Sequence, residues 1–380
     1  MLSLSAEQRM LVDTCRDLAE SEFADDAFTW GGETPWENIR TLADHGLLGV
    51  NFDEEYGGGG MSEFEVMLMT EVIGRVCPDT ARFVNSAHMI AARAIDMFGS
   101  EAAKQRYLPG VVDGEYMISI VISEPGAGSD VKAMETEIEE TDDGDLYLSG
   151  EKIWVSWVPE SRAGVVWTKF PDDTLGTVVM DFDDPGVEVT NHFTNMAGHT
   201  QTQFTMDDVH IPEEHVLVRG RDAFKEQLKA LNWERLSVAS YANTIAACAL
   251  DKALEYAQDR VQFDQPIADF QGMEWKLADM LKELELSRSI TYQTAEAAVA
   301  QGRVPDPLGT HIANLYAGEM VERVVSEALQ VHGANGYQQG HPLEYLYRLQ
   351  RGYRLGGGTD EIQKNTIARR LKDEGVPRLT

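Results

Sequence analysis

The sequence predicts an α+β protein in which a helical region, a strand-rich region and a second helical region follow one another. Apolar residues recur at three- and four-residue spacing over about residues 4–115 and again from about residue 222, as in amphipathic helices. Between these regions, short runs rich in β-branched and aromatic residues alternate with turn residues. A Rossmann-type protein would instead alternate strand and helix, so that class is not expected.

The first helical region begins with SAEQRML, where Ser5 is expected to cap a helix. The segment NFDEEYGGGG (51–60) is expected to form a loop, because its glycines and acids favour turns. Helices are then expected from about 62 to 77 and from about 80 to 98. These elements predict an N-terminal all-α domain over residues 1–115.

The strand region contains YMISIVISE, LYLSGEKIWVSWV and AGVVWTKF, followed by further short strands. The turn sequences GAGSD, DDGD, PDDT and DDPG separate them at short intervals, which predicts an antiparallel, barrel-like β domain over residues 116–222. Long helices are expected at about 234–263, 270–302 and 307–331. They predict a C-terminal four-helix bundle over residues 223–380.

The composition limits the classes of partner. The chain has 380 residues and a net charge of −32, from 64 acidic and 32 basic residues. Such a field disfavours nucleic acid and anionic membrane as partners. Because the acidic excess is spread along a foldable chain, it indicates a protein adapted to high salt; an ordinary acidic cytosolic protein is the alternative.

No secretory signal or 18-residue apolar run is present, so we expect a cytoplasmic protein without a membrane span. Cys15, Cys77 and Cys248 lie far apart in helix-like sequence. We expect no disulfide and no metal site, and interpret the cysteines as small buried residues.

Five segments carry possible chemistry, and each also has a purely structural interpretation. ISEPGAGSD (122–130) is a turn whose glycines allow backbone amides to approach a ligand. EKIWVSWVPES (151–161) is a strand whose tryptophans would ordinarily belong to a core. DRVQFDQPIADFQ (259–271) reads as a connection between helices. ALQVHGANGYQQGHPLEYLYR (328–348) reads as a helix end followed by an aromatic-rich segment. RLGGGTDEIQ (354–363) places three glycines between helix-like stretches. In a helix interior each glycine would cost about 1 kcal/mol of stability relative to alanine, so the run is expected to interrupt the helix.

The order and spacing of these segments resemble the acyl-CoA dehydrogenase family, which typically shows TEPGAGSD, KxWITN, RxxFGxPI…Q, QxxGGxG and YEGTxEIQ. The resemblance also includes LSAEQRML and EEYGGGG, so it covers essentially the whole chain. It implies the family fold, an acyl-CoA substrate and FAD as cofactor. It further implies electron-transfer flavoprotein as the electron acceptor, and a homodimer at least, commonly a homotetramer (a dimer of dimers).

The resemblance also implies site residues. Ser123 would bind the isoalloxazine edge, Trp154 would pack against the ring with Ser156 near it, and Thr359 would contact the FAD of its own subunit. Arg260, Gln271 and the turn from Gln330 to Gly333 would reach the FAD of a neighbouring subunit. The full set expected to bind FAD is Ile120, Ile122, Ser123, Gly128, Ser129, Trp154, Ser156, Arg260, Phe263, Phe270, Gln271, Gln330, Val331, Gly333, Ala334, Thr359 and Glu361. The set expected to bind the acyl-CoA is Ser129, Asn232, Arg235, Gly358 and Arg369.

The middle glycine of the GGG run stands where many family members have the catalytic base. Gly357 has no side chain, so the chain is either inactive or takes its base from elsewhere. The isovaleryl- and long-chain-type branches carry glycine in this slot and a glutamate in an ER-L segment, which here is Glu234–Arg235 in LNWERLSVA. We interpret Glu234 as the base that removes the substrate α-proton, with hydride passing from the β-carbon to flavin N5. The alternative is an exposed acid in the first turn of a helix, stabilised by the helix dipole.

Several departures from the family pattern leave alternatives open. Asp264 replaces a usual glycine, Gly356 a common tyrosine, Trp157 an asparagine and Leu349 an aspartate. Arg82, Asn85 and His88 on one predicted helix indicate either a polar helix face or a polar or short acyl group. Rival functions are an enoyl-CoA reductase resembling the crotonobetainyl-CoA reductases, a flavin oxidase or monooxygenase on the same fold, and a non-catalytic acyl-CoA-binding relative.

Overall fold

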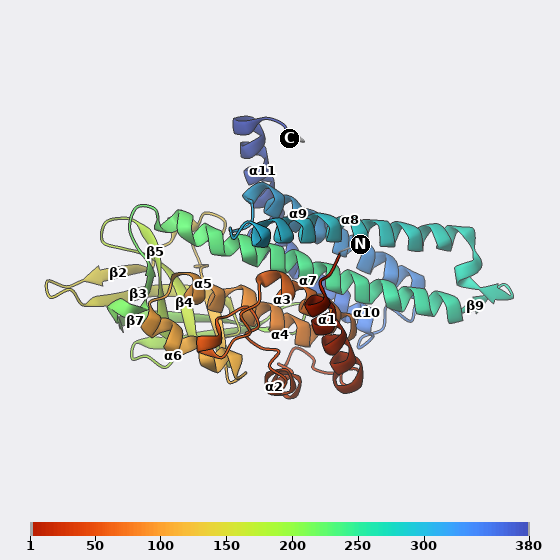
Figure 1. The fold of residues 1–380 in the computed structure, drawn as a ribbon, viewed down its shortest axis with the longest axis horizontal. Coiled ribbons are helices and arrows are strands. Elements are labelled where there is room, and N and C mark those ends of the chain that lie inside the picture. The colour runs from red at the N-terminus through yellow and green to blue at the C-terminus, as the bar shows by residue number, and fades with distance from the viewer. Residues whose placement is uncertain (1–2, 379–380) are drawn as a thin grey trace. The chain divides into compact units, whose positions relative to one another are not determined.

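The computed structural model describes residues 3–378, which form two compact units. One unit contains the residues up to 30, residues 67–82 and the residues from 234 onward, and the other contains 31–66 and 83–233. The main helices, labelled in Figure 1, are α1 (Ala6–Leu18), α2 (Trp36–Asp44), α3 (Glu63–Val76), α4 (Pro78–Met89), α5 (Ala91–Phe98), α6 (Glu101–Val112), α7 (Ala223–Asp259), α8 (Gln271–Ala300), α9 (Pro307–His332), α10 (Pro342–Gln350) and α11 (Asp360–Glu374). The strands are β1 (Met117–Val121), β2 (Glu137–Glu140), β3 (Leu146–Ser156), β4 (Ser161–Lys169), β5 (Leu175–Asp181), β6 (Val187–Thr194), β7 (Thr200–Ile211), β8 (Val216–Val218), β9 (Val261–Gln262) and β10 (Gln265–Pro266).

This order of elements confirms the predicted fold class: an N-terminal helical domain, a middle β domain and a C-terminal helical bundle. The first helix begins where its sequence predicts. The Ser5 hydroxyl accepts a hydrogen bond from the Gln8 backbone, and the Gln8 side chain accepts one from the Ser5 backbone, which together form a capping box. The three cysteines are buried, as predicted. No helix within residues 3–378 is both long and apolar enough to cross a membrane.

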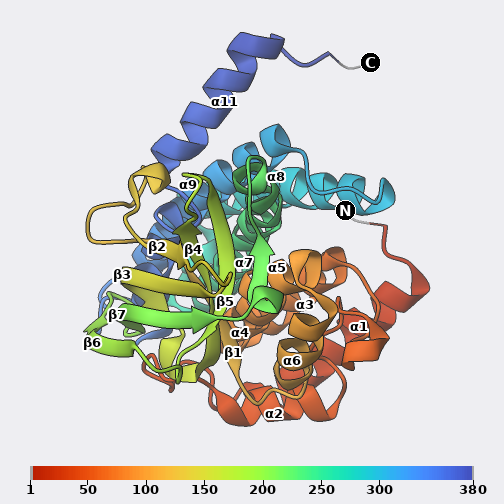
Figure 2. The same cartoon turned by 90° about the vertical axis from the view of Figure 1, so that its left-hand side faces the viewer.

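The middle domain is a mixed sheet, and here the prediction of a purely antiparallel domain was wrong. Seven strands follow the order β6-β7-β3-β2-β4-β5-β8, while β1 pairs with β4. Figure 2 shows β6, β7 and β3 next to one another in this sheet. β1 runs parallel to β4, with Ile120 opposite Val165, and β2 is also parallel to β4. A hairpin forces antiparallel pairing, but the long chain segment between β1 and β4, which includes β2 and β3, removes that constraint.

Two helical predictions also need correction. α7 begins at Ala223 rather than Glu234, because the upstream segment AFKEQLKALNW consists mainly of good helix formers. The single helix expected at 80–98 is instead two helices, α4 and α5. Ile90 separates them with backbone angles of φ −112° and ψ −102°, outside the helical region. By contrast, α8 and α9 lie within two residues of their predicted positions at every end.

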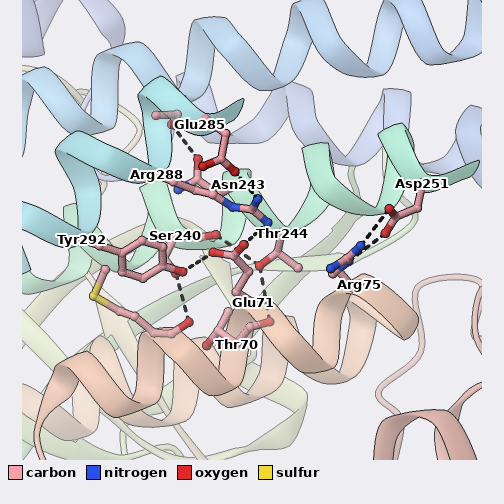
Figure 3. A network of polar contacts seen from close by, with 12 residues as sticks. Thr70, Glu71, Arg75, Ser240, Asn243, Thr244, Asp251, Glu285, Arg288 and Tyr292 are labelled. Atoms are coloured by element: carbon pink, nitrogen blue, oxygen red, sulfur yellow. Dashed lines mark hydrogen bonds and ion pairs between the residues drawn. The ribbon is translucent and has the colours of Figure 1, made fainter. Parts of the chain in front are cut away.

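A buried polar network fixes α7 against α3 and α8 within the helical bundle (Figure 3). The Glu71 carboxylate on α3 accepts a hydrogen bond from the Tyr292 hydroxyl and forms an ion pair with Arg288, both on α8. The Ser240 hydroxyl on α7 lies 3.3 Å from the Tyr292 hydroxyl. Nearer the surface, Arg75 and Asp251 form a two-pronged pair with distances of 2.7 and 2.8 Å. Since buried polar groups cost free energy unless paired, these contacts favour the register in which α7 packs on α3 and α8 here.

Candidate active site

Glu234 lies in the interior of α7 and is only 8% exposed. The alternative interpretation, an exposed acid in the first turn of a helix, is therefore wrong. Burial raises the pKa of the Glu234 carboxyl to about 7, although the neighbouring Arg235 guanidinium favours the ionised form. A carboxyl group with this pKa exchanges a proton readily near neutral pH, as a general base must.

Gly357 faces this carboxylate. Its backbone has a φ of +69°, a conformation that L-residues rarely adopt. A Cβ placed on Gly357 would lie 3.8 Å from Glu234 Oε1 and 3.8 Å from Arg235 Cγ. The Glu234 carboxylate therefore occupies the space in front of the glycine slot. Two positions 123 residues apart in the sequence thus meet at one place, and only one of them carries an acid.

Arg235 holds the glycine run to α7. Its Nε donates a hydrogen bond of 3.0 Å to the Gly357 carbonyl, and the Asn314 side chain on α9 donates one of 3.0 Å to the Arg235 carbonyl. Arg235 is buried, and burial lowers the pKa of its guanidinium. The contacts in the structure therefore assign Arg235 to holding the glycine run. Its contact with coenzyme A stays a prediction.

The other residues expected to bind the substrate are spread over both units. Asn232 is buried on α7 and Arg369 is exposed on α11. Gly358 follows Gly357 with a φ of +104°, and Ser129 is exposed in the other unit. Of these residues, Arg235 and Gly358 lie in the same unit, and Arg235 contacts Gly357, the residue before Gly358.

Ser123 and Trp154 lie side by side in the β-containing unit. The Ile153 backbone N–H donates a hydrogen bond of 3.0 Å to the Ser123 carbonyl, so the two motifs that carry these residues are joined. Trp154 has a φ of +63°, is 51% exposed and packs on Phe193 with ring centroids 4.6 Å apart. The core interpretation is therefore wrong for Trp154. It holds for Trp157, which is buried, with its ring edge against Phe83.

A buried ion pair that was not expected from the sequence joins the same two motifs. Lys152 is completely buried, and its Nζ lies 2.9 Å from Glu124 Oε1, 2.8 Å from the Trp167 carbonyl and 3.1 Å from the Ile122 carbonyl. The second Glu124 oxygen accepts from the Glu135 backbone. Burial lowers the pKa of the Lys152 ammonium to about 8, while Glu124 favours its charged form. Glu124 and Lys152 lie in the two quoted motifs, but no local spacing links residues 28 positions apart.

The remaining positions expected to bind FAD fall into three groups. The first group lies in or next to the Ser123 and Trp154 motifs and contains Ile120 on β1, Ile122, Gly128 and Ser156 at the end of β3. At one end of the helical bundle, Arg260, Phe263, Phe270 and Gln271 connect α7 to α8, and Gln330, Val331, Gly333 and Ala334 end α9. These two segments are neighbours, because Tyr256 on α7 stacks on His332 with centroids 4.3 Å apart. Thr359 and Glu361 begin α11, next to the glycine run.

The Arg82, Asn85 and His88 positions differ in environment. His88 is fully buried; its Nδ1 donates to the Val84 carbonyl and its Nε2 accepts from the Gly49 backbone at 2.7 Å. Asn85 is also buried. Arg82 lies in the other unit, against the Tyr353 hydroxyl. The structure therefore accounts for His88 as a packing residue, whereas Arg82 lies beside the segment that leads to the glycine run.

Comparisons with known proteins cover the whole chain. Residues 5–115, 119–209 and 223–372 match the family models for the N-terminal, middle and C-terminal domains of acyl-CoA dehydrogenase. A probable acyl-CoA dehydrogenase of Bacillus subtilis, YngJ, is 32% identical over 97% of this chain and 98% of its own. A 3-sulfinopropanoyl-CoA desulfinase of Paraburkholderia xenovorans is 32% identical over 97% of this chain and 96% of its own. The structure of a glutaryl-CoA dehydrogenase with glutaryl-CoA superposes with a TM-score of 0.92 at 30% identity, covering 100% and 98% of the two chains.

Proposed function

Because the chain belongs to the acyl-CoA dehydrogenase family, we propose that it catalyses the FAD-dependent α,β-dehydrogenation of an acyl-CoA thioester to the trans-2-enoyl-CoA. Glu234 is the base that removes the α-proton. The observation that carries this proposal is the position of the Glu234 carboxylate, 3.8 Å from where Gly357 would bear a Cβ. The acid that many family members carry in the glycine slot is thus replaced, in space, by one from α7.

The residues present fit a flavin, which the family uses. Trp154 offers a half-exposed indole beside the Ser123 motif. Gly128 has no atom within 4 Å of a Cβ placed on it, so the loop leaves room for a ligand. Ser123, Trp154 and Ser156 would hold the isoalloxazine ring, and the Lys152–Glu124 pair would keep their segments together. When bound, the flavin supplies a hydride acceptor for the substrate β-carbon.

The protein's own part in the reaction is to take the α-proton. A thioester α-hydrogen is a weak acid, so the carboxylate needs raised basicity, which burial of Glu234 supplies. The Arg235 hydrogen bond to the Gly357 carbonyl fixes the glycine run beside the carboxylate. Because Gly357 has no side chain, there is room for the α-carbon of the substrate within reach of Glu234. After proton transfer the neutral acid is favoured by the same burial.

The face of α7 that carries Glu234 favours an acyl group with a polar end. Glu234, Val238 and Tyr241 share this face, since they are spaced by four and three residues. Tyr241 packs on Tyr353 with centroids 5.1 Å apart, and the Arg82 guanidinium lies against the Tyr353 hydroxyl. The face therefore runs from the carboxylate past an apolar side chain to polar groups roughly 10 Å further along the helix. Relatives named glutaryl-CoA dehydrogenase and 3-sulfinopropanoyl-CoA desulfinase act on acyl groups that end in an acid.

We propose electron-transfer flavoprotein as the electron partner. A relative from Acetobacterium woodii, 29% identical, is named caffeyl-CoA reductase-Etf complex subunit CarC. Reduction of an enoyl-CoA is the second candidate function, because this relative and another, acryloyl-CoA reductase (NADH) of Anaerotignum propionicum, are named reductases. The Glu234 carboxylate would take the α-proton in the oxidative direction, and the same group in its acid form would deliver a proton in the reverse reaction.

Two observations support an assembly of several copies. Arg235, which contacts Gly357, and Tyr256, which stacks on His332, are 21 positions apart on α7, a rise of roughly 32 Å. Thr359 and the Arg260–Gln271 segment therefore do not meet at one flavin within a chain. In addition, α8 exposes Trp275, Leu281 and Leu286, and a groove of about 880 Å³ lies between α8 and α9. A second copy that covers this face would account for both, and we propose a homotetramer.

The proposed function is tested by an anaerobic visible titration of the flavin-loaded protein in molar salt. The panel pairs acyl-CoAs of equal length with and without a terminal acid, such as glutaryl-CoA against pentanoyl-CoA, and includes 3-sulfinopropanoyl-CoA. Bleaching of the flavin band by one class confirms dehydrogenation and identifies the acyl group. Loss of sulfinate without bleaching would contradict it, as would a protein that cannot be loaded with FAD.

A further inference from the structure

The glycine run is also held by α11. Gln363 on α11 is fully buried, and its Nε2 donates hydrogen bonds of 2.8 Å to the Gly358 carbonyl and 3.4 Å to the Gly357 carbonyl. Together with the Arg235 bond to Gly357, these contacts fix both carbonyls between two helices. The amide of Gln363 can do this only when its NH₂ group, and not its oxygen, faces the glycines.

His311 on α9 sets that orientation. Its Nδ1 is hydrogen-bonded to Gln363 Oε1, and the ring is 5% exposed. Because Gln363 Nε2 is the donor to the glycines, Gln363 Oε1 must accept, so His311 Nδ1 carries the proton. His311 therefore fixes the amide through one hydrogen bond of defined direction.

The charges around His311 keep the ring neutral. Burial lowers the pKa of its imidazole to about 4, and the Arg235 and Arg369 guanidinium groups act in the same direction, while Gln363 and the Asp306 carboxylate act against it. A cationic imidazole would stand beside two arginines, whereas the neutral ring still donates from Nδ1. The hydrogen bond to Gln363 is therefore kept over the pH range in which Glu234 titrates.

The same helix also holds the other side of the site. Asn314, one turn after His311 on α9, donates to the Arg235 carbonyl on α7. α9 thus makes contacts with both elements that face each other at the site, the Glu234–Arg235 segment and, through Gln363, the glycine run. A shift of either would change the separation between the Glu234 carboxylate and Gly357.

We propose that His311 is a positioning residue: through the orientation of the Gln363 amide it holds Gly357 and Gly358 at the distance from Glu234 that a substrate α-carbon requires. This inference rests on the proposed function, in which Glu234 is the base. Misplacement of reacting groups by about 1 Å costs on the order of 100-fold in rate. In this proposal His311 acts through its hydrogen bond to Gln363.

The chain offers a matched set of variants. In His311→Asn the amide nitrogen replaces Nδ1 and can donate to Gln363, whereas His311→Leu has nearly the shape of Asn and no donor. Gln363→Glu keeps the shape of Gln but cannot donate to the glycines when ionised. Thr310→Val is the control on the same helix, because the buried Thr310 hydroxyl makes no hydrogen bond within the described part of the chain.

Two readouts separate a local effect from general destabilisation. Hydrogen–deuterium exchange of peptides spanning 354–363 is expected to rise at least tenfold in His311→Leu and Gln363→Glu, with other bundle peptides unchanged. His311→Asn and Thr310→Val are expected to exchange like the parent. The rate of flavin reduction by a bleaching acyl-CoA is expected to fall at least tenfold in the first two variants, at unchanged half-saturating concentration, and to stay within threefold in the others.

Equal exchange and equal rates in His311→Asn and His311→Leu would overturn the inference, as would increased exchange throughout the bundle. Failure of the proposed function is distinguishable. If no acyl-CoA bleaches the parent protein, the proposed function falls, while the exchange measurement still decides whether His311 holds the glycine run.

Discussion

The strongest consequence of the site geometry is that the base can be moved back into the glycine slot. Glu234→Gly removes the carboxylate from α7, and Gly357→Glu introduces one on the opposite side. A Cβ at residue 357 would already lie 3.8 Å from the present position of Glu234 Oε1. The rest of a glutamate side chain spans that gap, so the double variant returns a carboxylate to the same place.

The magnitudes follow from the two positions. Loss of a general base typically lowers the rate 10²- to 10⁴-fold. We therefore expect the rate of flavin reduction in Glu234→Gly to fall by this factor. An L-residue at the φ of +69° of Gly357 costs about 1–2 kcal/mol in stability. Gly357→Glu alone would add a second carboxylate beside Glu234, and like charges at one site raise the pKa of one member strongly. We expect this single variant to be slower than the parent and less stable.

The assay is the single-turnover rate of flavin reduction under anaerobic conditions, with FAD content and melting temperature measured for each variant. The double variant is expected to recover at least tenfold over Glu234→Gly, despite its lower melting temperature. A folded, FAD-loaded double variant that is no faster than Glu234→Gly would show that a carboxylate at residue 357 does not replace Glu234.

Three further predictions test other parts of the structure. Lys152→Met leaves Glu124 as a buried charge without its ion-pair partner, so the free energy of unfolding should fall by about 3–5 kcal/mol and the FAD content should fall with it. Thermal melts and absorbance ratios measure the two effects, and Lys152→Met/Glu124→Gln should recover part of the loss. Burial lowers the pKa of His88 from 6.5 to about 4, so between these pH values the unfolded chain binds a proton that the native state does not. The free energy of unfolding should therefore fall by up to about 3 kcal/mol as the pH drops from 6.5 to 4. Denaturant melts at several pH values, with His88→Asn as the control, measure how much of this loss is due to His88. Leu286→Glu on the exposed face of α8 should lower the mass seen by light scattering, and an unchanged mass would place the interface elsewhere.

The parts of the fold that are encoded locally could be predicted from sequence. Ser5 and Gln8 form the capping box because both partners lie within one helical turn. The same holds for α9, whose predicted start at Pro307 follows an N-cap side chain, Asp306. The start of α7 was missed, because continuous helix-forming sequence gives no boundary signal before Glu234.

Contacts between distant segments could not be predicted in this way. The parallel pairing of β1 with β4 depends on the path of the intervening chain. The Glu124–Lys152 pair has no local spacing, although both residues lie in quoted motifs. The relation of Glu234 to Gly357 was expected from a family resemblance, and the structure adds their distance and the burial of the acid. The roles of the residues expected to bind FAD and coenzyme A stay predictions.

The central claim, that Glu234 takes the α-proton, is tested most directly by one rate. Gln has nearly the size and shape of Glu but no basic carboxylate, so it can replace the buried Glu234 without a change of volume. The measurement is flavin reduction by a bleaching acyl-CoA in Glu234→Gln, compared with the parent at equal FAD content. We predict a fall of at least 100-fold, with acyl-CoA binding retained. A rate within threefold of the parent would contradict the account.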